Sequence, residues 1–198
     1  MNIIKSLLAT ALTTTIVALT AQVQASNVIL IIGDGMDDQQ LTAARNYLYG
    51  AQGHTILSTL PIRSAVQVLT VDEAHPKQPV YVADSANSAT ALSSGNIISR
   101  GRIGTSAGSN EDFETIVELA QKAGLKTGLV STAAITDATP AAFIAHVNDR
   151  GCESTQHMVQ FESHGDRIVD CASDTKQQGG KGSIAEQLAD SQVDVLLG

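Results

Sequence analysis

Continuous apolar runs and alternating apolar positions mark four segments of the 198-residue chain as strands. Residues 27–35, NVILIIGDG, form an unbroken apolar run that ends in glycine, which predicts a strand buried on both faces of a parallel sheet. Residues 125–132 and 193–198 have the same character, and residues 62–72 alternate between apolar and polar positions. We therefore expect four strands.

Helical signals lie between these strands. Residues 37–50 are helix formers up to Gly50, and residues 111–124 place apolar side chains at helical spacing before Gly124. Further along, Thr139 suits an N-cap and Pro140 the first helical position of a helix. The last helix starts at the capping-box sequence SIAE, before the final strand.

The alternation of strands and helices predicts an α/β fold, with a mostly parallel sheet flanked by helices on both faces. The Gly- and Ser-rich residues 101–110 read as a surface loop. Ligands of such folds collect beyond the carboxyl ends of the strands. Because the sequence stops directly after a strand, we expect the front part of a longer protein, with a sheet that is incomplete at the C-terminus.

Composition narrows the classes of partner. Apolar residues make up 43% of the chain and aromatic residues only 3%, so the core must be built from Val, Ile, Leu and Ala. The formal net charge of −8, with no cluster of Lys and Arg, argues against nucleic acid as a partner. An acidic protein that binds a small anion needs a metal or a few well-aimed cations.

The first 25 residues predict a signal peptide. Lys5 precedes an uncharged stretch that is short for a bilayer span, and small residues suit cleavage after Ala25. A membrane anchor is the alternative. We expect export to the periplasm or medium, no membrane contact after cleavage, and residues 26–198 to be the N-terminal part of one domain. In an oxidising compartment Cys152 and Cys171 can form a disulfide, which we favour over a metal site.

Asp34 and Ser85 are the first two candidates for chemistry. Asp34 lies in a GDG turn at the end of the first strand, where its carboxylate could bind Zn²⁺ or Mg²⁺ or simply shape the turn. Ser85 follows Asp84 at the start of a helical segment, where a helix N-terminus attracts phosphoryl groups. A serine nucleophile also needs a base or a metal. Taken alone, an N-capping serine is the simpler interpretation.

Three more candidates follow the second buried strand. Asp137 and Thr139, two residues apart, can both face a hard cation at the same sheet edge as Asp34, although Thr139 is also explained as an N-cap. Arg150 has a planar guanidinium that can hold two phosphate oxygens, with a solvated helix-end arginine as the alternative. The GGKGS segment lacks the features of a P-loop. The five histidines show no metal-ligand spacing, and we assign them no role.

Four segments together resemble the N-terminal half of bacterial alkaline phosphatases. They are ILIIGDGM, VADSANSATALSSG, VSTAAITDATPAAFIAHVNDR and GGKGSIAEQLADSQVDVLLG, in the order and with the spacing of that family. The resemblance implies a phosphomonoesterase with two zinc ions and one magnesium ion per site, acting through a phosphoserine intermediate. Its substrate would be a small phosphomonoester, and the resemblance suggests a homodimer.

The resemblance also implies residue roles. Ser85 would be the nucleophile, Arg150 would clamp the phosphate, and Asp84 would help to position that arginine. The metal ligands would be Asp34 for one zinc and the magnesium, with Asp137 and Thr139 at the magnesium.

Two departures from the family stand out. Asp37 and Asp38 replace a glycine that often follows GDGM, and the family's remaining zinc ligands come from a later half that this sequence lacks. Two other interpretations are a truncated, non-catalytic remnant that binds phosphate or metal weakly, and a relative of the sulfatases or phosphodiesterases. The serine of DSA argues against the sulfatases and phosphodiesterases, which commonly have a modified cysteine or a threonine there.

Overall fold

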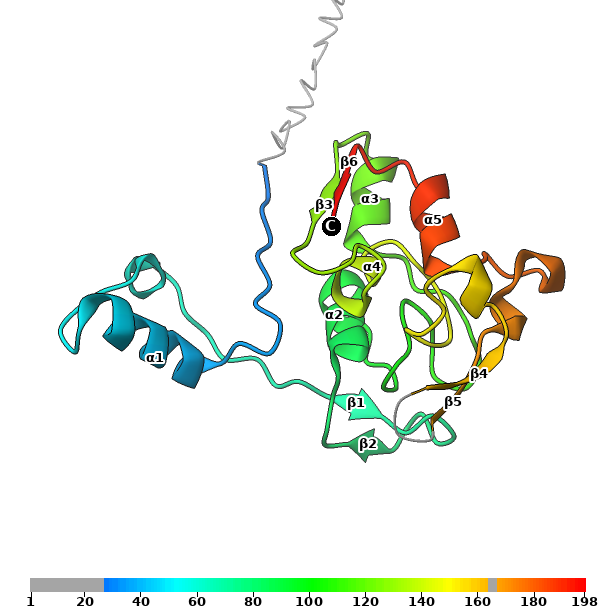
Figure 1. Cartoon of the computed structure of the whole chain (residues 1–198), viewed down its shortest axis with the longest axis horizontal. Helices are drawn as coiled ribbons and strands as arrows, with labels where there is room; N and C mark the ends of the chain where they lie inside the picture. The colour runs from blue at the N-terminus through cyan, green and yellow to red at the C-terminus, as the bar shows by residue number, and fades with distance from the viewer. Residues whose placement is uncertain (1–26, 164–166) are drawn as a thin grey trace, which may run out of the picture. The chain divides into compact units, whose positions relative to one another are not determined.

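The computed structural model describes residues 27–163 and 167–198, and it divides the chain into residues up to Gly33 and residues 34–198 (Figure 1). The predicted signal peptide, residues 1–25, lies outside the described residues. In the described part of the chain, no helix combines the length and apolar character that a bilayer crossing requires.

The predicted strand over residues 27–35 is wrong. Residues 27–33 have no secondary structure, and Val28, Ile29 and Ile31 are 85–88% exposed. A strand exists only through hydrogen bonds to a neighbour, and none of the described residues pairs with this segment. The apolar run is therefore present without the sheet that would bury it.

The first helix is as predicted. Helix α1 spans Asp38–Tyr49 and ends at Gly50, which has a positive φ of 73°. Asp37 is its N-cap, and its carboxylate accepts hydrogen bonds from the N–H groups of Gln39 and Gln40. The Gln40 side-chain oxygen accepts the Asp37 N–H, which completes a capping box. Asp37, which together with Asp38 departs from the family pattern, thus has a local structural role. A short 3₁₀ helix, η1 (Ile56–Thr59), follows.

The strands form three separate pairs. They are β1 (Thr70–Val71) with β2 (Pro79–Val80), antiparallel; β3 (Gly128–Val130) with β6 (Val195–Leu197), parallel; and β4 (Gln160–Ser163) with β5 (Arg167–Asp170), antiparallel. The β3–β6 pair confirms the two predicted later strands and their parallel direction. The strand predicted over residues 62–72 is reduced to β1.

The remaining helices are short and capped. They are α2 (Ser85–Ser94), α3 (Ile116–Lys122), α4 (Ala138–Ala141) and α5 (Ile184–Asp190), with 3₁₀ turns η2 (Thr155–His157), η3 (Ala172–Asp174) and η4 (Lys176–Gln178). The capping box of α5 is the predicted Ser183–Glu186 pair. Helix α4 is shorter than predicted because the chain that follows bends away and Val147 forms a bridge with Ile103.

The core of residues 34–198 lies around α2 and α4, which are side by side in Figure 1. Residues 101–107 run through this core, so the predicted surface loop over 101–110 is wrong except at its tip. Ile103 is fully buried, and its N–H and C=O both bond to Val147, at 3.1 and 2.9 Å. Gly104, with φ of 63°, approaches the Ala145 carbonyl so closely that a Cβ would lie 2.4 Å from its oxygen.

The predicted disulfide between Cys152 and Cys171 is present, and both residues are fully buried. It joins the segment after α4 to the end of β5, across 19 residues of sequence. The cysteines pack against the core, whereas the sequence placed them in a polar loop.

Candidate functional site

Asp34 brings together two hydroxyl groups from distant parts of the chain. Its Oδ1 accepts a hydrogen bond from Ser85 Oγ at 3.5 Å, and its Oδ2 accepts one from Thr139 Oγ1 at 3.0 Å. These partners lie 51 and 105 residues away in the sequence. The three candidate residues therefore form one cluster, although the strand predicted to lead into Asp34 is absent.

Ser85 is the first residue of α2 and does not cap it. The cap is Asp84, whose Oδ1 accepts the Asn87 N–H at 3.1 Å, while Asn87 Oδ1 accepts the Asp84 N–H at 2.7 Å. The simpler interpretation of Ser85 as an N-capping serine is therefore wrong. Because Asp84 takes the capping role, the Ser85 hydroxyl is directed to Asp34.

Thr139 is likewise not a cap. Asp137 holds that position, with its Oδ1 accepting the Ala138 N–H at 2.7 Å, so Thr139 is the second helical residue and Pro140 the third. The predicted N-cap at Thr139 and first helical position at Pro140 are both displaced by two residues. This shift leaves the Thr139 hydroxyl available to Asp34.

Arg150 lies between two of the candidate carboxylates. Its Nη2 donates to Asp137 Oδ1 at 2.7 Å, and its Nη1 lies 3.6 Å from Asp84 Oδ2. The side chain is 30% exposed, so part of the guanidinium reaches solvent. The alternative of a solvated arginine at a helix end is wrong, because α4 ends nine residues earlier and both carboxylates hold the side chain.

The cluster has an excess of negative charge. It contains three carboxylates, on Asp34, Asp84 and Asp137, and one guanidinium, on Arg150. Asp84 and Asp137 contact Arg150, and Asp34 contacts Ser85 and Thr139, which lie one and two residues after those aspartates in the chain; we call these six residues the Asp34 cluster. Such a set attracts a cation more readily than a free phosphate. The oxygens of Asp34, Asp137 and Thr139 are the donors that Mg²⁺ prefers. Within the described residues, however, no three His, Cys, Asp or Glu side chains are grouped to hold a metal, so the closed shell of a zinc site is not supplied there.

Gly101 is a residue of this region that the sequence pattern missed. Its N–H donates to Asp84 Oδ2 at 3.1 Å, and its carbonyl accepts the Arg150 N–H at 2.6 Å. The sequence pattern predicts a surface loop for its segment, and such a loop gives no reason to expect a role for Gly101 in the site. The only available signal was the glycine itself.

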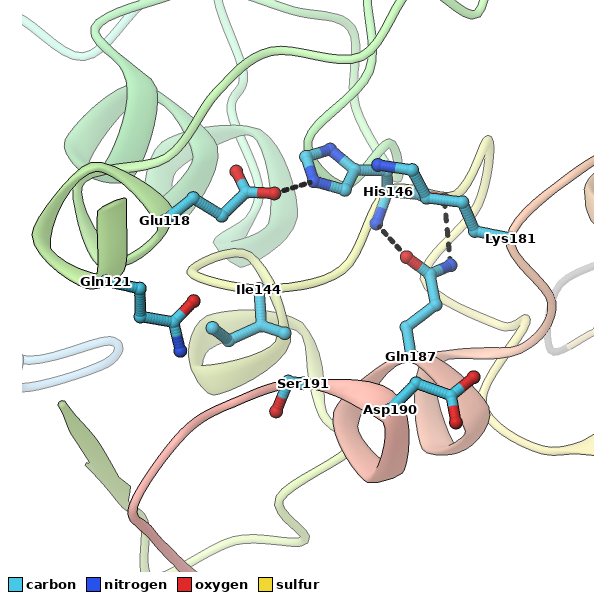
Figure 2. A pocket seen from close by; sticks show the side chains of 8 residues that line it. All are labelled: Glu118, Gln121, Ile144, His146, Lys181, Gln187, Asp190 and Ser191. Atoms are coloured by element: carbon cyan, nitrogen blue, oxygen red, sulfur yellow. Dashed lines mark hydrogen bonds and ion pairs between the residues drawn. The ribbon is translucent and has the colours of Figure 1, made fainter. Parts of the chain in front are cut away.

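His146 was also given no role from the sequence. It lines a cavity of about 370 Å³, which is separate from the residues around Asp34 (Figure 2). Its Nε2 lies 3.1 Å from Glu118 Oε1 and its Nδ1 lies 3.0 Å from the Gly104 carbonyl oxygen, so both ring nitrogens face an oxygen atom. Gln187 bonds both the N–H and the C=O of His146. None of the residues that line this cavity belongs to the Asp34 cluster.

Glu118, on the same cavity, has a shifted pKa. Burial raises the pKa of its carboxyl group, but hydrogen bonds from the Thr115 N–H and from His146 outweigh burial, and the pKa lies below its ordinary value. The bond from Thr115 completes the capping box of α3, and the contact with His146 links α3 to the core. We assign this group a structural role.

Comparison with known proteins gives a consistent result. Residues 25–198 match the family model described as alkaline phosphatase. The chain is 44% identical over 174 residues to streptomycin-6-phosphate phosphatase of Streptomyces griseus and 43% identical over 175 residues to alkaline phosphatase of Escherichia coli strain K12. Each match covers 88% of this chain and 36% or 35% of the relative, so the chain spans about a third of their length.

A solved structure is also similar. It is a mutant alkaline phosphatase of the Antarctic bacterium TAB5 with Mg bound, at 26% identity and a TM-score of 0.50. The similarity covers 79% of this chain and 35% of that one. It supports the predicted α/β class, although the sheets within the described residues are small.

Proposed function

The chain belongs to the alkaline phosphatase family, and from that premise we propose that it supplies the nucleophile and the phosphate-binding side of a metal-dependent phosphomonoesterase. The observation that carries the proposal is the Asp34 cluster. Asp34 contacts Ser85 and Thr139, and Arg150 contacts Asp84 and Asp137, which lie one and two residues before that serine and threonine. The substrate class is a small phosphomonoester.

Ser85 is the nucleophile in this proposal. It occupies the first position of the ten-residue helix α2, where backbone N–H groups of the first turn have no partner within the helix and the helix dipole is positive. A phosphoryl group bonded to its Oγ would lie beside those N–H groups. The Asp34 carboxylate orients the hydroxyl before attack.

Arg150 binds the phosphate oxygens. Asp84 and Asp137 take part of its hydrogen-bonding capacity and fix the plane of the guanidinium, while its exposed part faces solvent, from which a substrate would approach. A preorganised arginine loses less conformational freedom when it binds an anion than a free one does. Asp84 and Asp137 are thus positioning residues for Arg150.

Metal ions fit this cluster in part. Asp34, Asp137 and Thr139 would contribute oxygen ligands to a magnesium ion, and Asp34 would contribute to zinc; the described residues do not supply the other ligands of a closed zinc site. Bound metals would lower the pKa of a hydroxyl nucleophile and neutralise charge on the phosphoryl group. The cluster has more carboxylates than cationic groups, which favours the binding of metal cations.

Export and dimer formation complete the proposal. The buried disulfide is suited to an oxidising compartment, and residues 1–25 have the pattern of a signal peptide. A homodimer rests on family resemblance alone.

The proposal is tested by the ester preference and metal dependence of the purified full-length protein. We expect hydrolysis of an aryl phosphate, its loss after treatment with a chelator, and its return with zinc and magnesium together. Preferential hydrolysis of an aryl sulfate or of a phosphodiester would instead indicate a relative of the sulfatases or phosphodiesterases. Binding of phosphate without turnover, with both metals at saturation, would support a non-catalytic remnant.

A further inference from the structure

Gly101 forms hydrogen bonds to the Asp84 carboxylate and to the backbone N–H of Arg150, the residue proposed to bind the phosphate. We infer that Gly101 is a positioning residue, which holds the Asp84 carboxylate and the Arg150 backbone at a fixed separation. The inference rests on the proposed function, because it concerns how Arg150 is presented to phosphate.

Both polar groups of the Gly101 backbone are used in this connection. The N–H donates to Asp84 Oδ2 at 3.1 Å, the same oxygen that lies 3.6 Å from Arg150 Nη1. The carbonyl accepts the backbone N–H of Arg150 at 2.6 Å. Gly101 is buried, so water does not compete freely for either bond. Asp84 and Arg150 therefore contact each other directly and also through this one residue.

The Gly101–Arg150 bond lies close in sequence to the isolated antiparallel bridge between Ile103 and Val147. Ile103 and Val147 exchange both backbone hydrogen bonds, and Thr105 Oγ1 donates to the Val147 carbonyl at 3.2 Å. On the other side of this segment, the Gln187 side chain bonds the backbone N–H and C=O of His146, as Figure 2 shows. The backbone leading to Arg150 is thus fixed before its side chain reaches Asp84 and Asp137.

Only glycine adopts the Gly101 conformation without strain. Its φ is 81°, in the region that residues with a Cβ rarely occupy. Relaxing φ to a negative value would turn the N–H away from Asp84 or the C=O away from Arg150. Gly124, after α3, has a similar φ of 75° and open space around its Cβ position, and it has no contact with the Asp34 cluster. It is a matched control for backbone strain.

The test compares Gly101→Ala with Gly124→Ala in the full-length protein. We expect both variants to lower the melting temperature, because both force alanine to a positive φ. Only Gly101→Ala should raise the inhibition constant of inorganic phosphate, by about tenfold or more. Equal inhibition constants in the two variants would overturn the role of Gly101. Absence of phosphomonoester hydrolysis in the unmodified protein would instead contradict the proposed function.

A measurement on the unmodified protein covers the case in which Gly101→Ala does not fold. Saturating inorganic phosphate should slow amide hydrogen exchange at Gly101 and Arg150, because a bound anion immobilises the linked residues. The Gly95 amide, which bonds Ala91 at the end of α2, is the control and should not change. Unchanged exchange at Gly101 while phosphate is bound would overturn the inference.

Discussion

The Asp34 cluster and the segment that leads into it differ sharply. Around the cluster, α2 and α4 begin at capped residues, pack against each other and hold Ser85, Thr139 and Arg150 in defined contacts. Residues 27–33, with a stronger apolar pattern, are exposed and form no strand with any part of the chain that the structure describes. Caps and turns are satisfied within a few residues, whereas a strand depends entirely on partners elsewhere. Local capping bonds can therefore start the helices that carry the site residues while the sheet remains partial, and the contacts between those residues are long-range.

Ser85→Ala should have the largest effect and should separate activity from folding. Removing the nucleophile should lower phosphomonoester turnover by at least about 10³-fold in the full-length protein. The hydroxyl is not the helix cap, so the melting temperature should change little. Ser88→Ala, on the same helix, is the control and should keep most activity. A large fall in melting temperature with Ser85→Ala would mean that the cluster is structural.

Arg150→Ala should weaken phosphate binding by about 2–5 kcal/mol, because it removes the only guanidinium between Asp84 and Asp137 among the described residues. Inhibition by inorganic phosphate measures this loss. Lys122→Ala removes a cation that pairs with Glu114 and serves as the control. Unchanged phosphate inhibition in Arg150→Ala would refute its role.

Loss of the disulfide should destabilise the core of residues 34–198 and leave residues 27–33 unaffected. Replacing Cys152 and Cys171 together by alanine should lower the free energy of unfolding by about 3 kcal/mol, as expected for a closed loop of this length. Urea denaturation measures the change. Hydrogen exchange of residues 27–33 should be the same with and without the disulfide. A change there would show that this segment is coupled to the core.

The smallest effect should come from Glu118, whose contribution to the free energy of unfolding should depend on pH. Because its folded pKa lies below the ordinary value near 4.5, its stabilising contribution is present above that value and is lost as the pH falls through the folded pKa. At pH 7, Glu118→Gln should cost about 1–2 kcal/mol. This difference from the unmodified protein should shrink toward pH 3, as unfolding by urea at each pH would show. The exposed Glu114→Gln is the control, and a difference constant with pH would contradict this assignment.

The sequence predicted the helices well because their signals are local. Gly50, Gly124 and the Ser183–Glu186 pair mark ends that the structure confirms. The N-caps of α2 and α4 were wrongly assigned to hydroxyl residues, since aspartate, serine and threonine are all good caps and the aspartate occupies the position in both helices.

The burial of residues 101–107 and the role of Gly101 could not be predicted in the same way. Both depend on contacts with residues 145–150, more than 40 positions later. The residues of the cluster were identified by their chemistry and by family resemblance. Their mutual contacts became visible only in the structure.

The central claim is that Ser85 receives the phosphoryl group, and the most direct test is to look for it there. The full-length protein, mixed with a phosphomonoester and quenched in acid, should contain one phosphoryl group, which peptide mass spectrometry should locate on Ser85. Continued turnover with the phosphoryl group on another residue, or with no phosphorylated protein under conditions that trap the intermediate, would contradict the account.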